Sequence, residues 1–126
     1  MDTVIYDAGA LIAADRNERR FWVEHRVRLE RGTLPVVPAV VVAQVSRAGK
    51  QAQLRRLLRG CEVSGLDEQT AHQIGACLAK ASTTDVIDGA VVVDGVKRNA
   101  GIVTRDVEDI RALLTALNAS LPIFQV

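Results

Sequence analysis

Short apolar runs alternate with longer amphipathic segments along the chain. Each run holds four to six residues and lies close to Gly, Pro or Asp, which is typical of buried strands. We predict strands at Thr3–Tyr6 (TVIY), Leu34–Pro38 (LPVVP), 61–66 (CEVSGL) and 100–104 (AGIVT). The run LPIFQV at 121–126 is a candidate edge strand.

The segments between these runs have helical periodicity and residues typical of helix boundaries. The sequence that follows Asp7, AGALIAA, predicts a turn into a short helical stretch. Asp67 stands at an N-cap position, STTD precedes another helix, and Gly32 and Gly49 follow helical segments. The further helices predicted on this basis span 17–31, 39–48, 51–60, 67–81, 85–98 and 107–117.

Strands and helices alternate throughout the chain. This pattern is typical of a parallel sheet covered by helices on both faces. The chain has the usual length of one compact domain, and it contains no internal repeat, linker or low-complexity tract. We therefore predict an α/β fold with a central parallel sheet of four or five strands, in a single domain over residues 1–126.

Aspartates directly follow two of the predicted strands. Asp7 comes after the first strand and Asp106 after the fourth. Because parallel strands end at the same edge of a sheet, where ligands bind, both carboxylates are expected at one edge. Asp85 and Asp88 are three residues apart in the first turn of a helix that begins on this side, and Asp106 and Asp109 repeat the spacing.

Several carboxylates at one edge repel one another unless a cation lies among them. Carboxylate oxygens are the ligands that Mg²⁺ and Mn²⁺ prefer, and such an ion can activate water and stabilise displacement at phosphorus. The alternative is that the acids cap helices and complement helix dipoles, which is favoured for Asp85 and Asp109 taken alone. It is disfavoured for Asp7, because a charge at the buried end of a strand needs a partner.

The net charge of +1 hides an uneven distribution of charge. Residues 16–59 contain eleven Lys or Arg and three Glu, whereas the rest of the chain contains five basic and twelve acidic residues. This suits an enzyme that binds a polyanion and holds a cation; the alternative is a pair of solvated helices with Arg-rich faces. No signal peptide, no apolar run of membrane-spanning length and no CxxC motif is present, so we expect a cytoplasmic protein.

Three stretches carry a resemblance to a known family: DAGALI, PAVVVAQVSRAG and DVIDGAVVVDGVKRNAGIVTRDVEDI. Together, by their order and spacing, they resemble a PIN-domain nuclease, and more narrowly a VapC-type toxin of bacterial toxin–antitoxin pairs. The resemblance covers almost the whole chain. It implies a three-layer α/β/α fold, Mg²⁺ or Mn²⁺ as cofactor, endoribonuclease activity on RNA, and a homodimer. It also implies a cognate antitoxin that wraps the toxin and blocks its site.

The resemblance implies roles for individual residues. The positions that match the family's metal-binding acids are Asp7, Asp88 and Asp106, and the secondary positions are Asp85, Thr104 and Asp109. Gln44 stands where the family has Glu, and an amide cannot supply the missing negative charge. The alternative function is therefore a catalytically inactive PIN-like domain that binds RNA or a partner.

Basic side chains near the acidic site are predicted to bind RNA phosphates: Arg47, Lys50, Arg55 and Arg56. Receiver domains and haloacid-dehalogenase-like phosphatases also place aspartates at strand ends. The chain resembles them less, because a single acid follows its first strand, its last strand has no Lys, and Gly9 occupies the position of the phosphatases' second acid. His25 and His72 are expected at surface or half-buried positions without a catalytic role.

Overall fold

The computed structural model describes residues 2–126, in which strands and helices alternate as the sequence predicts. Five parallel strands form one sheet: β1 (Thr3–Tyr6), β2 (Leu34–Pro38), β3 (Glu62–Ser64), β4 (Gly101–Thr104) and β5 (Ile123–Gln125). Seven helices lie in the described residues: α1 (Ala8–Asp15), α2 (Arg19–Glu30), α3 (Ala39–Val45), α4 (Ala52–Arg59), α5 (Glu68–Ala81), α6 (Val86–Arg98) and α7 (Val107–Ala116). The candidate edge strand is thus present as β5.

The strands lie in the order β3–β2–β1–β4–β5. The chain builds outward from β1 through β2 to β3, and then returns to place β4 on the other side of β1. Ile5 of β1 accordingly pairs with Val36 on one side and with Ile102 on the other. The strand order therefore reverses between β1 and β4, which is the point at which ligands bind in open α/β sheets.

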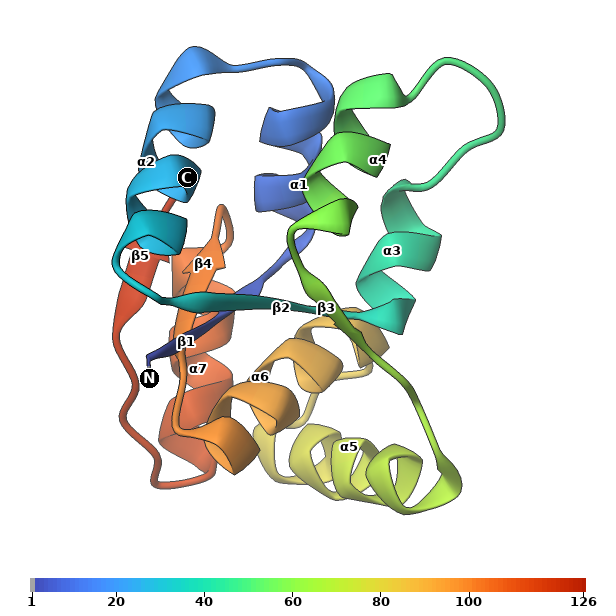
Figure 1. Cartoon of the computed structure of the whole chain (residues 1–126). Coiled ribbons are helices and arrows are strands. Elements are labelled where there is room, and N and C mark those ends of the chain that lie inside the picture. The colour runs from blue at the N-terminus through green and yellow to red at the C-terminus, as the bar shows by residue number, and fades with distance from the viewer. Residues whose placement is uncertain (1) are drawn as a thin grey trace.

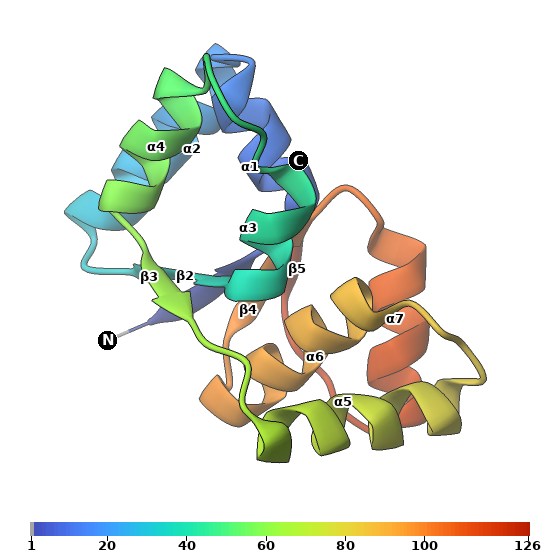
Figure 2. The same ribbon diagram turned by 90° about the vertical axis from the view of Figure 1, so that its right-hand side faces the viewer.

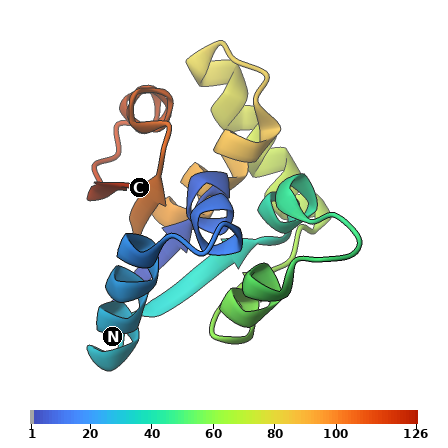
Figure 3. The same ribbon diagram turned by 90° about the horizontal axis from the view of Figure 1, so that it is seen from above.

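Helices cover both faces of the sheet. Figure 1 shows α1, α2 and α4 on one face and α5, α6 and α7 on the other, and Figure 2 shows the same layers from the side. From above, α1 lies between α2 and α4 (Figure 3), and it contacts both. The predicted three-layer arrangement is confirmed. No helix in the described part of the chain combines the length and the apolar character that a membrane span requires.

Small and branched apolar residues fill most of the interior. Ile5 and Ile102 of the sheet and Val91 of α6 are completely buried. Burying a side chain of this size contributes about 1.5–3 kcal/mol. On the opposite face, α2 packs its Phe21 ring against Tyr6 of β1, with 5.4 Å between the ring centres.

Two local predictions are wrong. The helix predicted to reach residue 48 ends at Val45, because the Gln51 amide satisfies the backbone there: it donates to the Val45 carbonyl at 3.1 Å and accepts from the Arg47 N–H at 2.5 Å. His25, expected at a surface or half-buried position, is 4% exposed. Its Nδ1 lies 2.8 Å from the Tyr6 hydroxyl, which compensates for burying a polar ring.

Candidate metal centre

Two aspartates lie at the carboxyl edge where the strand order reverses. Asp7 directly follows β1 and caps α1, accepting a hydrogen bond from the Ala8 N–H at 2.7 Å. Asp106 stands between β4 and α7. Because β1 and β4 are neighbours in the sheet, the two residues are brought to the same point by topology.

Asp88 reaches this point from the first turn of α6. The next residue, Gly89, packs closely against α5: a Cβ there would lie 2.9 Å from Leu78 Cδ2 and 3.0 Å from Ile74 Cγ2. The missing side chain lets α6 approach α5 and sets the position of the helix N-terminus. Asp85 caps the helix, with its Oδ1 accepting the Asp88 N–H at 3.0 Å.

Asp7, Asp88 and Asp106 converge. Each offers a carboxylate oxygen, and the three oxygens lie within 4.8 Å of one another. Asp7 is 2% and Asp88 is 7% exposed, whereas Asp106 is open to solvent. Residues 2–126 contain no second cluster of three or more His, Cys, Asp or Glu with this geometry.

The Thr104 hydroxyl links two of these acids. It donates to Asp7 Oδ2 at 2.8 Å and accepts from the Asp106 N–H at 3.0 Å. Together with the Ala8 N–H, it gives each Asp7 oxygen a hydrogen bond, which fixes the orientation of the carboxylate. By contrast, no group in residues 2–126 donates a hydrogen bond to the Asp88 carboxylate.

Burial and mutual repulsion raise the pKa of two carboxyl groups in the cluster. Desolvation, followed by the charges of Asp85, Asp7 and Asp106, raises the pKa of Asp88 to about 7. Desolvation also raises the pKa of Asp7, although the hydrogen bonds from Thr104 and Ala8 act in the opposite direction. A nearby cation favours the ionised form of a carboxyl. Three hard oxygen donors with unbalanced negative charge could therefore hold a metal ion.

The secondary acids, Asp85 and Asp109, lie at the rim. Both are exposed and neither belongs to the group of three. Asp85 caps α6 and Asp109 lies in the first turn of α7. These positions agree with the alternative interpretation of the sequence, in which the two acids cap helices and complement helix dipoles. Their charges also contribute to the raised pKa of Asp88, so the acidic field extends beyond the three converging residues.

Gln44 and two of the predicted RNA-binding residues lie on the exposed α3–α4 segment. Gln44 is in the last turn of α3, a helix that contacts both α1 and α6. Arg47 and Lys50 follow in the exposed loop, where an Arg47 guanidinium N–H donates to the Ser46 carbonyl at 2.6 Å.

The other two basic residues are on α4. Arg55 is exposed and donates to the Gly49 carbonyl at 3.1 Å. Arg56 lies over Trp22 of α2, with its guanidinium carbon 4.4 Å from the ring centre. This contact helps to pack α4 against α2.

Sequence reasoning missed two residues that shape the site, Gly9 and Arg105. A Cβ on Gly9 would lie 2.8 Å from the Arg105 Cβ and 3.1 Å from its backbone nitrogen, so α1 begins directly against the turn that carries Asp106. The Arg105 guanidinium pairs with Glu18 at 3.6 Å and its side chain is half exposed. A Gly two residues after Asp7 was the feature of the sequence that could have indicated this close approach.

Comparisons with known proteins support the fold. No family model matches the chain, and no curated protein matches its sequence. Among solved structures, the chain is similar to VapBC2 from Rickettsia felis, bound to a DNA fragment from their promoter, with a TM-score of 0.71 and 12% identity over 98% of each chain. It is also similar to FitAcB from Neisseria gonorrhoeae, with a TM-score of 0.64 and 15% identity over 96% of each chain.

A third similar structure is PAE2754 from Pyrobaculum aerophilum, with a TM-score of 0.61 and 17% identity over 91% of this chain and 86% of that chain. At these identities the likeness concerns the fold. The predicted PIN-like α/β/α architecture is thereby confirmed, and its parallel sheet, predicted to have four or five strands, has five.

Proposed function

We propose that this chain is a divalent-metal-dependent endoribonuclease and the toxin of a toxin–antitoxin pair. The observation that carries the proposal is the convergence of Asp7, Asp88 and Asp106 at the point where the strand order reverses. The fold supports it as well, because VapBC2 bears the name of the VapC-type pairs that the sequence resembles.

The residues of the site have separable roles in this proposal. Asp7, Asp88 and Asp106 would hold Mg²⁺ or Mn²⁺, and Thr104 keeps Asp7 oriented through its 2.8 Å hydrogen bond. A bound divalent ion supplies Lewis-acid stabilisation of the negative charge that develops on phosphate oxygens. Asp106 is the exposed member, so it would be the most accessible of the three to incoming substrate.

Arg47, Lys50, Arg55 and Arg56 would bind the phosphates of RNA on either side of the cleaved bond. Each phosphate contact that is lost should weaken RNA binding and flatten its salt dependence. Arg55→Glu and Arg56→Glu together test this role by the slope of affinity against salt concentration. An unchanged slope would leave these arginines as a solvated face of α4.

A second candidate function is a catalytically inactive PIN-like domain that binds RNA or a protein partner. Gln44 favours it, because this neutral amide occupies the position at which the family has Glu. Gln lowers the negative charge available to hold a cation and cannot act as a carboxylate base. Glu and Gln are nearly equal in size, and the position is exposed, so exchanging them should not disturb the fold.

RNA cleavage by the purified chain distinguishes these two functions. We expect weak cleavage with Mn²⁺ or Mg²⁺, none with a chelator, and a gain of about tenfold or more in Gln44→Glu. Adding Asp7→Asn to that variant should abolish the gain. Failure of both the parent chain and Gln44→Glu to cleave RNA with metal present would support the inactive domain instead.

We further propose a cognate antitoxin as partner, a homodimer as the assembled form, and the cytoplasm as the compartment. The neighbour VapBC2 supports the partner. If a small open reading frame directly upstream encodes this antitoxin, its co-expression with the chain should yield a complex in which RNA cleavage is blocked. Sedimentation at micromolar concentration should give the mass of a dimer, and a monomer there would contradict that part of the proposal.

A further inference from the structure

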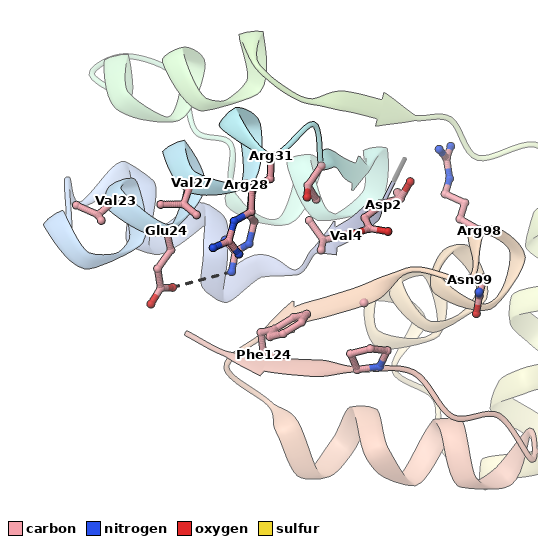
Figure 4. Close-up of a pocket in the computed structure, with 14 residues that line it drawn as sticks. Asp2, Val4, Val23, Glu24, Val27, Arg28, Arg31, Arg98, Asn99 and Phe124 are labelled. Carbon is pink, nitrogen blue, oxygen red and sulfur yellow. Dashed lines mark ion pairs between the residues drawn. The ribbon is translucent and has the colours of Figure 1, made fainter.

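A cavity of about 740 Å³ opens at the amino edge of the sheet, opposite the acidic site. Figure 4 shows its two walls, with α2 on one side and the strands on the other. The strand wall includes residues at or next to the starts of β1, β4 and β5: Thr3, Gly101 and Pro122. The volume is in the range of small-molecule sites, about 300–1,000 Å³.

Apolar side chains from distant parts of the sequence line this cavity. Val23 and Val27 on α2 are 52% and 37% exposed, and Phe124 on β5 is 45% exposed. Figure 4 shows the Phe124 ring on the strand wall, across from α2. The three side chains together form a partly hydrated apolar surface suited to the body of a ligand.

A preorganised cation lies between these walls. The Arg28 side chain is only 16% exposed, donates to the Tyr6 hydroxyl at 3.2 Å and lies over the Tyr6 ring with 5.5 Å to its centre. Its nearest carboxylate, Glu24, is 4.0 Å away and also pairs with Arg20 at 3.1 Å. The guanidinium of Arg28 is therefore held in place, partly desolvated and weakly neutralised.

A second cation lies one turn further along the chain, at the residue that follows α2. Arg31 lines the cavity, is exposed, and forms no ion pair within residues 2–126. The other charged lining residues lie at the far end of the cavity, where Arg98 pairs with Glu62 at 2.7 Å and Asp2 lies nearby (Figure 4). The uncompensated positive charge is thus concentrated beside the apolar walls.

We propose that this cavity binds a small organic anion with an apolar body, that is, a carboxylate, sulfonate or phosphate monoester of hydrocarbon or aryl type. The anionic head would meet Arg28 and Arg31, and the body would lie between Val23, Val27 and Phe124. A neutral apolar ligand would desolvate Arg28 further and leave only Glu24, 4.0 Å away, to balance its charge. An organic cation would be repelled by both arginines.

The probe for this site is 8-anilinonaphthalene-1-sulfonate, a fluorescent anion with an aryl body. We expect one molecule to bind per chain, with enhanced fluorescence. Arg31→Glu should weaken binding about tenfold, and Val23→Ser should weaken it about threefold. Both positions are exposed, so the variants should fold. Arg26→Glu is the matched control, because Arg26 is exposed on α2 but does not line the cavity, and it should bind as the parent does.

Two further measurements separate this site from non-specific dye binding. The uncharged analogue N-phenyl-1-naphthylamine should bind at least about tenfold more weakly than the sulfonate. Amide shifts on titration with octanoate should change around Val27 and Phe124 and not around Asp7. Equal binding of charged and neutral dyes, full affinity in Arg31→Glu, or shifts centred on Asp7 would each overturn the proposal. RNA cleavage plays no part in these readouts, so the outcome is independent of the proposed nuclease activity.

Discussion

At the scale of single residues, Asp88 has the environment least favourable to its charge. It is 7% exposed, and desolvation and neighbouring acids raise its pKa to about 7. In an unfolded chain the pKa of Asp is about 3.9. The folded state therefore holds this proton more tightly than the unfolded state does. The resulting stabilisation is complete below about pH 3.9 and is lost as the pH rises through about 7.

We predict that Asp88→Asn stabilises the metal-free protein more at pH 8 than at pH 5. The amide keeps the size of the side chain and cannot ionise, and it removes a penalty of up to about 4 kcal/mol at pH 8. Thermal unfolding in a chelator at the two pH values measures the difference. Asp109→Asn, at an exposed acid outside the cluster, should change little. An equal gain at both pH values would show that the charge of Asp88 is not the cause.

His25 affects the pH dependence of stability in the opposite direction from Asp88, because folding lowers its pKa. The Tyr6 oxygen accepts from Arg28 at 3.2 Å and lies 2.8 Å from His25 Nδ1. We expect the Tyr6 hydroxyl to donate its own hydrogen to Nδ1, an arrangement that would place the imidazole proton on Nε2. Desolvation, with the charges of Arg28 and Arg56, lowers the pKa of His25 to about 4. Stability linked to this residue is therefore lost as the pH falls from about 6.5 to about 4.

We predict that nuclear magnetic resonance titration of His25 gives a midpoint near 4, with the Nε2–H tautomer at neutral pH. Tyr6→Phe removes the hydrogen bond to Nδ1 and should weaken the preference for this tautomer. The nitrogen chemical shifts of the imidazole ring report both quantities. A midpoint near the ordinary value of about 6.5 would contradict the burial and charge argument.

At the scale of elements, the site depends on how closely α1 approaches the turn between β4 and α7. Gly9 makes this approach possible, because a side chain there would meet both the Cβ and the backbone nitrogen of Arg105. The turn carries Asp106, so its displacement would separate Asp106 from Asp7.

We predict that Gly9→Ala lowers stability by about 1–3 kcal/mol and weakens Mn²⁺ binding. Denaturant unfolding and metal titration measure the two effects. Gly75→Ala in α5 is the control: a Cβ there has no heavy atom within 4 Å, so it should stabilise the helix by about 0.5–1 kcal/mol and leave metal binding unchanged. Unaltered metal affinity in Gly9→Ala would show that the turn adjusts without moving Asp106.

At the scale of the whole molecule, the acidic edge joins segments that are far apart in the sequence. Asp7, Asp88 and Asp106 come from the start of α1, the first turn of α6 and the turn before α7. A divalent ion that binds only the folded arrangement stabilises it, by about 2.7 kcal/mol when the free ion is at 100 times its dissociation constant. Metal binding and global stability should therefore be coupled.

We predict that Mn²⁺ raises the midpoint of thermal unfolding in a concentration-dependent way. Asp7→Asn should remove most of this shift, because it replaces a proposed ligand whose two oxygens are already oriented by Ala8 and Thr104. Potassium chloride at the same ionic strength controls for screening of charge. A shift that persists in Asp7→Asn would place the ion elsewhere.

The order of elements and the shared edge of Asp7 and Asp106 could be predicted from the sequence. Apolar runs of strand length, alternating with helical segments, leave a parallel sheet as the arrangement that buries both faces. Once the strands are parallel, an acid that follows a strand must lie at their common carboxyl edge. The order of the elements and the shared edge follow from connectivity alone, so local sequence patterns are sufficient to predict them.

Only the tertiary structure decided the features that depend on close packing between distant segments. The early end of α3 requires the Gln51 side chain, the burial of His25 requires the Tyr6 hydroxyl, and the position of Asp88 requires the contact of Gly89 with α5. The cavity between α2 and β5 likewise exists only after residues at opposite ends of the chain meet. The energies of these contacts depend on distances of a few tenths of an ångström, which no periodicity in the sequence specifies.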